Sequence, residues 1–286
     1  MRQNLGGVAY NVTRALHLLN NKSICLLTVA GKLNSLAQND STPVRIHEFE
    51  NESTASYISL LDSKTSELIS GFGDMDIYER QLTPKFLDQN LSILIETQWI
   101  MFDANLSSNT IEYLVHIGKI NQKKLVFISA GGPTKAQKIR NHLSDVHVIF
   151  CNRLEFQMIT NSSSSIEQNL KDLLIKYPNL KLICITLGSQ GVLVGHQGQL
   201  KHYQALKLNE DIRNVTGAGD SFAAGVMSQL LKSNFDMIDR AIACGLLAAR
   251  LTLTSANTIS EKLQTIDEKQ LDRICSNELQ FKQIII

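Results

Sequence analysis

The chain has 286 residues, 43% of them hydrophobic, which is enough for one large α/β domain with a substantial buried core. The formal net charge is only +1 and no basic block occurs, which argues against nucleic acid or a membrane surface as a principal partner. The five cysteines show no Cys-x-x-Cys spacing, and neither a secretory leader nor a spanning apolar run is present, so we expect a cytoplasmic protein with reduced thiols.

The N-terminal segment has a glycine pair followed by a predicted helix. Gly6 and Gly7 precede apolar residues at helical spacing, and Asn11 lies early in that helix. Glycine lets a ligand approach the backbone, and the Asn amide can donate to and accept from vicinal hydroxyls. The same pattern is also that of an ordinary turn before a helix.

Apolar runs alternate with stretches of helical spacing through the middle of the chain. The predicted strands are Ile24–Val29, Trp99–Asp103, Leu125–Ser129, His147–Cys151 and Leu182–Leu187. The predicted helices are Thr110–Ile117, Thr134–Leu143 and Ile166–Tyr177. This alternation predicts a mostly parallel sheet with helices on both faces. Residues 44–72 differ, because two β-rich runs flank a polar tip at Asp62–Thr65, which indicates a hairpin.

Two of the predicted strands are followed by polar motifs. Asn152-Arg-Leu-Glu155 comes after one strand, and its spacing is that of a helix N-cap and its capping-box partner. Thr186-Leu-Gly188-Ser-Gln-Gly191 comes at the end of the next strand, where a hairpin turn is one interpretation. Neither motif identifies a ligand by itself.

The segment Asn214–Gly225 combines a glycine turn, a carboxylate and the start of a helix. Gly217 and Gly219 allow positive φ and bring backbone N–H groups close to an anion, while the helix N-terminus also favours a phosphate. Asp220 would repel that phosphate, so its position suits a base. The pattern therefore predicts a phosphoryl-transfer site, with an ordinary strand-to-helix turn as the alternative.

Together and in this order, the motifs resemble the ribokinase-like (PfkB) family of carbohydrate and nucleoside kinases. The resemblance implies a three-layer α/β/α fold with a mostly parallel central sheet and a small β lid. It implies one kinase domain over residues 1–286, with lid strands at approximately 1–8 and 44–72 and a core at approximately 9–43 and 73–286. ATP and Mg²⁺ are the implied cofactors, and a monovalent cation is left open.

The resemblance also implies roles for individual residues. It assigns catalysis to Asp220, Gly217, Ala218 and Gly219, nucleotide binding to Thr186, Gly188, Gly191 and Asn257, sugar binding to Gly6, Gly7 and Asn11, and a water-mediated Mg²⁺ to Asn152 and Glu155. Asp220 would accept the proton of the substrate hydroxyl, and the glycine-turn N–H groups would stabilise the transferred phosphoryl group.

Weaker matches resemble the pseudouridine kinase group of this family. They are Met1–Val8, Thr54–Asp62, Gly73–Asp76, Asp103–Ser107 and Leu246–Leu253. They imply transfer of the ATP γ-phosphate to the 5′-hydroxyl of pseudouridine. A kinase for another nucleoside or for a sugar such as ribose is the first alternative.

One departure concerns the first strand of the family, which would precede Gly6 and which this chain does not contain. We expect either the kinase part of a larger protein or an incomplete sheet, so a non-catalytic nucleotide-binding protein is the second alternative. A small-molecule substrate and ATP are the expected partners. A homodimer, and fusion to or association with a glycosidase domain, are left open.

Overall fold

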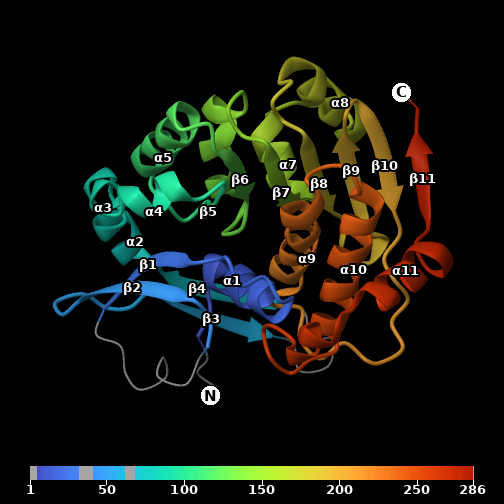
Figure 1. Cartoon of the computed structure of the whole chain (residues 1–286), viewed down its shortest axis with the longest axis horizontal. Coiled ribbons are helices and arrows are strands. Elements are labelled where there is room, and N and C mark those ends of the chain that lie inside the picture. Colours follow the sequence, from blue (N-terminus) through green and yellow to red (C-terminus); the bar gives the residue numbers. More distant parts are fainter. Residues whose placement is uncertain (1–4, 32–40, 62–67, 286) are drawn as a thin grey trace. The chain divides into compact units, whose positions relative to one another are not determined.

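The computed structural model describes residues 5–31, 41–61 and 68–285 (Figure 1). The chain forms two compact units. Unit 1 comprises Met1–Ile77 and Leu206–Leu279, and unit 2 comprises Tyr78–Ala205 and Gln280–Ile286. Each unit is therefore assembled from segments that are distant in the sequence.

Unit 2 is built on a sheet whose seven described strands have the order β11-β10-β9-β8-β7-β6-β5. They are β5 (Trp99–Asp103), β6 (Lys124–Ile128), β7 (Val148–Asn152), β8 (Leu182–Thr186), β9 (Val192–His196), β10 (Gln199–Tyr203) and β11 (Phe281–Ile284). Neighbours from β5 to β8 are parallel, and those from β8 to β11 are antiparallel. Most of the described strands, β5 to β8 and β10, therefore run in one direction, which confirms the mostly parallel sheet.

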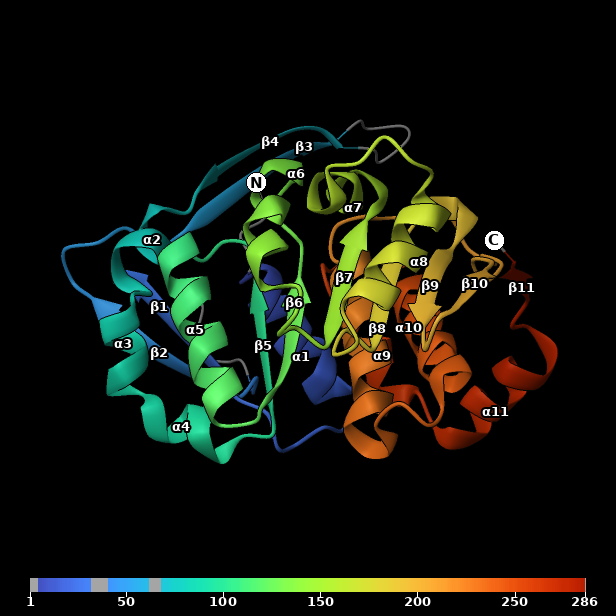
Figure 2. The ribbon, with the colours of Figure 1, turned by 90° about the horizontal axis from the view of Figure 1, so that it is seen from above.

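Burial explains why the central strands read as continuous apolar runs. Nearly every residue of β6, β7 and β8 is buried, as expected for parallel strands covered on both faces. Helix α5 (Ser108–Ile120) packs on β6, α7 (Arg153–Thr160) on β7 and β8, and α8 (Ile166–Lys176) on β9 and β10. Figure 2 shows α7 and α8 beside these strands. At the contact of α8 with β9, a Cβ on Gly195 would lie 2.8 Å from Leu170.

The other helices of unit 2 are short. They are α2 (Asp76–Gln81, which begins in unit 1), α3 (Pro84–Gln89), α4 (Leu91–Glu96), α6 (Pro133–Ala136) and the 3₁₀ turns η2 (Gln137–His142) and η3 (Gly188–Gln190). The helix expected over Thr134–Leu143 is thus an α-helical turn followed by a 3₁₀ segment. Its apolar spacing fits both forms, because the two differ little over so few residues.

Unit 1 has helix α9 at its centre. Its helices are α1 (Val8–Leu18), α9 (Ala218–Ser233), α10 (Ile238–Leu253), η4 (Glu261–Thr265) and α11 (Glu268–Asn277). All residues from Ser221 to Leu230 of α9 are buried, and α9 packs on α1 and α10 (Figure 1). A Cβ on Gly225 would lie 2.7 Å from the Cys244 carbonyl oxygen, so glycine is what lets α9 and α10 pack this closely.

Two small sheets complete unit 1. Strand β1 (Leu26–Gly31) pairs parallel with β2 (Val44–Phe49), and β3 (Ser56–Leu61) pairs antiparallel with β4 (Leu68–Asp74). The hairpin expected within residues 44–72 is therefore formed by β3 and β4, whereas β2 pairs elsewhere. Its tip at Asp62–Thr65 lies outside the described residues. Of the lid strand expected at residues 1–8, the described part has no strand, because Leu5–Gly7 are irregular and α1 begins at Val8.

No helix within the described residues is long and apolar enough to cross a lipid bilayer. All five cysteines are free, and Cys151, Cys184 and Cys244 are buried.

Candidate functional site

The carboxylate of Asp220 lies in the first turn of α9, directly after a glycine turn. Gly217 is the N-cap and has φ +83°, a left-handed conformation in which a Cβ would lie 2.1 Å from the Thr258 carbonyl oxygen. Only glycine fits there without strain. A carboxylate in the first turn is also favoured by the positive end of the helix dipole. The turn expected at Gly217 and the position expected for Asp220 are both present.

Gly219 differs from the sequence-based expectation. It is a helical residue without positive φ, and an added Cβ would have no atom within 4 Å. The freedom of glycine is therefore not needed for the backbone conformation at this position. What Gly219 does provide is an exposed backbone with open space around it, which is suited to the close approach of an anion.

The N-terminal motif meets Asp220 within unit 1. Gly7 is the N-cap of α1 with φ +99°, and its carbonyl oxygen accepts the Asn11 N–H at 2.8 Å. The Asn11 side-chain Nδ2 donates to Asp220 Oδ2 at 2.7 Å across a sequence separation of 209 residues. We expected the Asn11 amide both to donate to and to accept from substrate hydroxyls. One of its two N–H donors is directed at Asp220.

The N-terminus of α9 is also tied to the end of α10. The hydroxyls of Ser221 and Thr252 are buried and lie 2.8 Å apart, and Thr252 Oγ1 also accepts the Ser260 N–H at 3.4 Å. Asn257 lies in the loop between α10 and η4, where it is exposed and its N–H donates to Ser255 Oγ at 3.1 Å. The loop that carries Asn257 therefore borders the glycine turn, because the next residue, Thr258, packs on Gly217.

In unit 2, Asn152 and Glu155 form a complete capping box at the start of α7. Asn152 Oδ1 accepts the Glu155 N–H and Glu155 Oε2 accepts the Asn152 N–H, each at 2.9 Å. The capping role expected from the spacing is therefore confirmed. Asn152 is exposed, whereas Glu155 is 6% exposed.

The second motif of unit 2 connects two antiparallel strands. Thr186 pairs with Val192 at the ends of β8 and β9, and Gly188 and Gly191 have φ +62° and +94°. A Cβ on Gly191 would lie 2.1 Å from the Tyr203 carbonyl oxygen. The segment is thus a hairpin connection that requires glycine. It also lies beside the capping box, since Asn152 and Thr186 are partners in the β7–β8 register.

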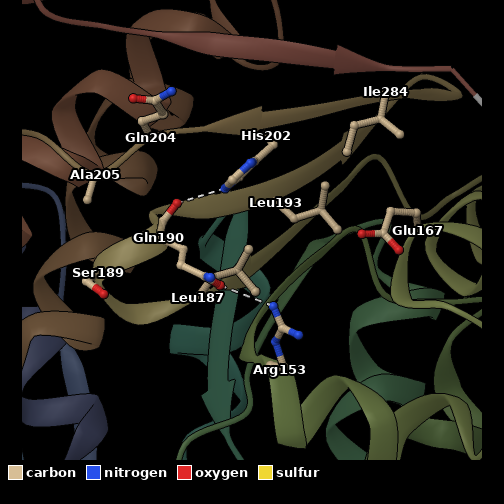
Figure 3. Close-up of a pocket in the computed structure, with 10 residues that line it drawn as sticks. All are labelled: Arg153, Glu167, Leu187, Ser189, Gln190, Leu193, His202, Gln204, Ala205 and Ile284. Atoms are coloured by element: carbon tan, nitrogen blue, oxygen red, sulfur yellow. Dashed lines mark hydrogen bonds between the residues drawn. The ribbon is translucent and has the colours of Figure 1, made fainter.

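A pocket of about 410 Å³ adjoins both unit 2 motifs (Figure 3). It is lined by Arg153, Glu167, Leu187, Ser189, Gln190, Leu193, His202, Gln204, Ala205 and Ile284. Arg153 donates to Gln190 Oε1 at 3.4 Å, and His202 Nε2 donates to the Gln190 carbonyl oxygen at 2.8 Å. Sequence reasoning missed these residues, although Arg153, Leu187, Ser189 and Gln190 are four of the five positions that the two motifs leave unspecified.

The donor chemistry of Asn152 and Glu155 fits a magnesium ion that keeps its water ligands. Both supply oxygen, which Mg²⁺ prefers, and each already accepts a backbone N–H. The described residues contain no group of three or more His, Cys, Asp or Glu side chains placed to hold a metal ion. The arrangement therefore suits ordered water around the ion rather than a closed protein cage.

Burial sets the ionisation of several other groups. Burial raises the pKa of the Cys151 and Cys244 thiols, and a protonated thiol is a poor nucleophile, so these cysteines are structural. Burial, with a smaller effect of Asp103, raises the pKa of Tyr78 to about 12. Burial lowers the pKa of Lys138, whose Nζ donates to the carbonyl oxygens of Ala104 (3.2 Å) and Leu106 (2.7 Å).

Solved kinases have the same fold. The ribokinase of Giardia lamblia superposes with a TM-score of 0.77 over 96% of this chain and 89% of its own, at 18% sequence identity. The protein is therefore a ribokinase-like α/β protein.

The family assignment rests on sequence. The model of the pfkB family of carbohydrate kinases matches residues 1–266. The chain belongs to this family and is accordingly an ATP-using phosphotransferase that acts on a hydroxyl group of a small molecule, a sugar or a nucleoside.

Two characterised kinases show the range of relatives. Pseudouridine kinase of Escherichia coli (strain K12) is 28% identical over 233 residues, which cover 78% of this chain and 72% of that protein. Ribokinase of Staphylococcus aureus (strain COL) is 32% identical over 124 residues, which cover 42% of this chain and 40% of that protein.

Proposed function

We propose that the protein transfers the γ-phosphoryl group of ATP to the 5′-hydroxyl of pseudouridine, with Asp220 as the general base. The observation that carries the proposal is the hydrogen bond between Asn11 and Asp220, because it joins the N-terminal motif to the carboxylate that follows the glycine turn. The similarity to pseudouridine kinase over most of the chain supports the choice of substrate.

In the proposed reaction, Asp220 accepts the proton of the substrate hydroxyl as its oxygen forms a bond to the γ-phosphorus. The bond from that phosphorus to the β–γ bridging oxygen breaks, and ADP leaves. The backbone N–H groups of Gly217, Ala218 and Gly219 stabilise the negative charge on the transferred group. Gly6, Gly7 and Asn11 bind the ribose.

The nucleotide is proposed to bind through Thr186, Gly188, Gly191 and Asn257. Asn152 and Glu155 would hold Mg²⁺ through water, and the ion would neutralise phosphate charge. We also propose that the β3–β4 hairpin acts as a lid that excludes water from the γ-phosphate, within a single kinase domain. The free cysteines support a reducing, cytoplasmic setting.

A second candidate is phosphorylation of ribose or of another nucleoside, which the similarity to ribokinase over part of the chain supports. The family assignment argues against the non-catalytic nucleotide-binding protein that was the second alternative from the sequence. A requirement for a monovalent cation, a homodimer, and fusion to or association with a glycosidase domain stay predictions.

The test is ADP production with Mg²⁺-ATP and pseudouridine, uridine, adenosine or ribose. We expect turnover with pseudouridine, and a loss of kcat of roughly 10²–10⁴-fold in Asp220→Asn, which keeps the shape and removes the base. Asp236→Asn changes an exposed carboxylate of unit 1 and serves as the matched control. Preferred turnover of ribose would replace the substrate. Near-normal kcat in a folded Asp220→Asn variant would exclude Asp220 as the base.

A further inference from the structure

The hydrogen bond between Asn11 and Asp220 fixes the orientation of the Asn11 amide. A carboxylate has no donor, so the amide atom that faces Asp220 is the nitrogen, and Oδ1 is directed away from it. Asn11 is only 5% exposed, and α1 packs directly against α9. The amide is thus held between the two helices near their N-termini.

The other end of the amide lacks a partner. Asn11 Oδ1 is buried, and no donor among the described residues reaches it. A buried acceptor without a donor carries a desolvation cost that no hydrogen bond offsets. Packing alone does not explain this arrangement, because a buried apolar side chain in the same place would avoid that cost.

We propose that Asn11 is a positioning residue for Asp220, in addition to binding substrate. Its Nδ2 holds the carboxylate in the orientation that accepts the proton, and its Oδ1 accepts a hydrogen bond from a substrate hydroxyl. One amide therefore couples the presence of substrate to the position of the base. This inference rests on the function proposed above.

Two consequences separate this role from that of a residue that only binds substrate. A residue that only binds substrate changes KM and acts independently of the base. A residue that positions the base also changes kcat, and its effect on kcat disappears once the base is gone. The two roles are therefore distinguished by a double-mutant cycle.

The experiment measures kcat and KM for wild type, Asn11→Ala, Asp220→Asn and the double variant, with Mg²⁺-ATP and pseudouridine. Ribose replaces pseudouridine if the substrate panel shows that ribose is preferred. We expect Asn11→Ala to lower kcat by roughly 10²-fold, as misplacement of a catalytic group does, and to raise KM. In the Asp220→Asn background it should lower kcat no further. Thr13→Val is the matched control, because Thr13 is buried on the same helix and its hydroxyl donates to the Ala9 carbonyl oxygen at 2.8 Å.

The outcomes distinguish this inference from the proposed function. If Asn11→Ala changes only KM, or if the two losses of kcat multiply, Asn11 does not act through Asp220 and the positioning role is overturned. If Asp220→Asn itself keeps its kcat, the general base of the proposed function fails first. Asn11→Ser, which keeps a small polar group, replaces Asn11→Ala in the same cycle if the alanine variant does not fold.

Discussion

The two units differ in how far folding alone accounts for their motif residues. In unit 2, Asn152 and Glu155 cap a helix, and Gly191 completes a hairpin. In unit 1, the contact between Asn11 and Asp220 leaves a buried acceptor without a donor among the described residues. A ligand-binding role is therefore argued directly from the geometry in unit 1, whereas in unit 2 it must be separated experimentally from a role in stability.

The largest expected effect comes from two glycines of the same turn in unit 1. Gly217→Ala places a Cβ at positive φ and against the Thr258 carbonyl oxygen, so it should destabilise the protein by at least about 2 kcal/mol. Gly219→Ala has room for its Cβ within a helix and should stabilise the free protein by about 0.5–1 kcal/mol. The same methyl group would occupy the proposed anion space, so turnover should fall by roughly 10²-fold.

Urea unfolding and kcat, measured on both glycine variants, check this prediction. Gly198→Ala in unit 2 is a useful reference, because Gly198 has φ +74°, close to that of Gly217, and no atom lies within 4 Å of an added Cβ. It should show the backbone strain alone. A Gly219→Ala variant with unchanged kcat would mean that the turn in unit 1 is structural, like the hairpin in unit 2.

A smaller effect is expected at the capping box of unit 2. Glu155→Gln keeps an oxygen that can accept the Asn152 N–H, so the free energy of unfolding should change by less than about 0.5 kcal/mol. The substitution removes the carboxylate charge. If this pair organises Mg²⁺, the magnesium concentration for half-maximal activity should rise several-fold.

The stability control for this prediction is Asn152→Ala, which removes the cap and should cost about 1 kcal/mol. Asn152→Ser keeps a capping oxygen and should restore most of that loss. An unchanged magnesium dependence in Glu155→Gln would assign the pair to helix capping alone and widen the contrast between the units.

Much of unit 2 could be predicted from the sequence because its strands are buried on both faces. Trp99–Asp103 was predicted with the bounds of β5, and the strands at β6, β7 and β8 were predicted within a residue or so at each end. Strands β9 to β11 were not predicted, because Gly195 interrupts the apolar run of β9 and polar residues interrupt those of β10 and β11. The form of η2 was not predicted either, because apolar spacing does not distinguish a 3₁₀-helix from an α-helix over so few residues.

Long-range pairing could not be predicted. The run Ile24–Val29 was expected in the main sheet, but β1 pairs with β2 in unit 1. Both strands are only partly buried, and their apolar pattern does not specify the partner strand. Likewise, the motifs at Asn11 and Asp220 could be recognised separately. Their hydrogen bond depends on how α1 packs on α9, which no local pattern specifies.

The smallest expected effect concerns the acid stability of unit 2. His147 Nδ1 accepts the Leu125 N–H at 3.2 Å, which requires the neutral imidazole. Burial, and then Lys124 and Lys181, lower the pKa of His147 from 6.5, while Asp145 opposes them weakly. As the pH falls through 6.5, the unfolded chain therefore binds a proton before the folded chain does, and stability decreases.

This loss should stay below about 1 kcal/mol, because the imidazole is partly solvated. His147→Asn keeps an acceptor for the Leu125 N–H and cannot be protonated, so its Tm should fall less than that of wild type between pH 7.5 and 5.5. The control is His116→Asn, at an exposed position of α5, whose Tm should follow that of wild type. If His147→Asn shows the full acid dependence, other groups set the acid stability of the protein. If it does not, protonation of His147 accounts for the loss of acid stability, through the hydrogen bond from the Leu125 N–H.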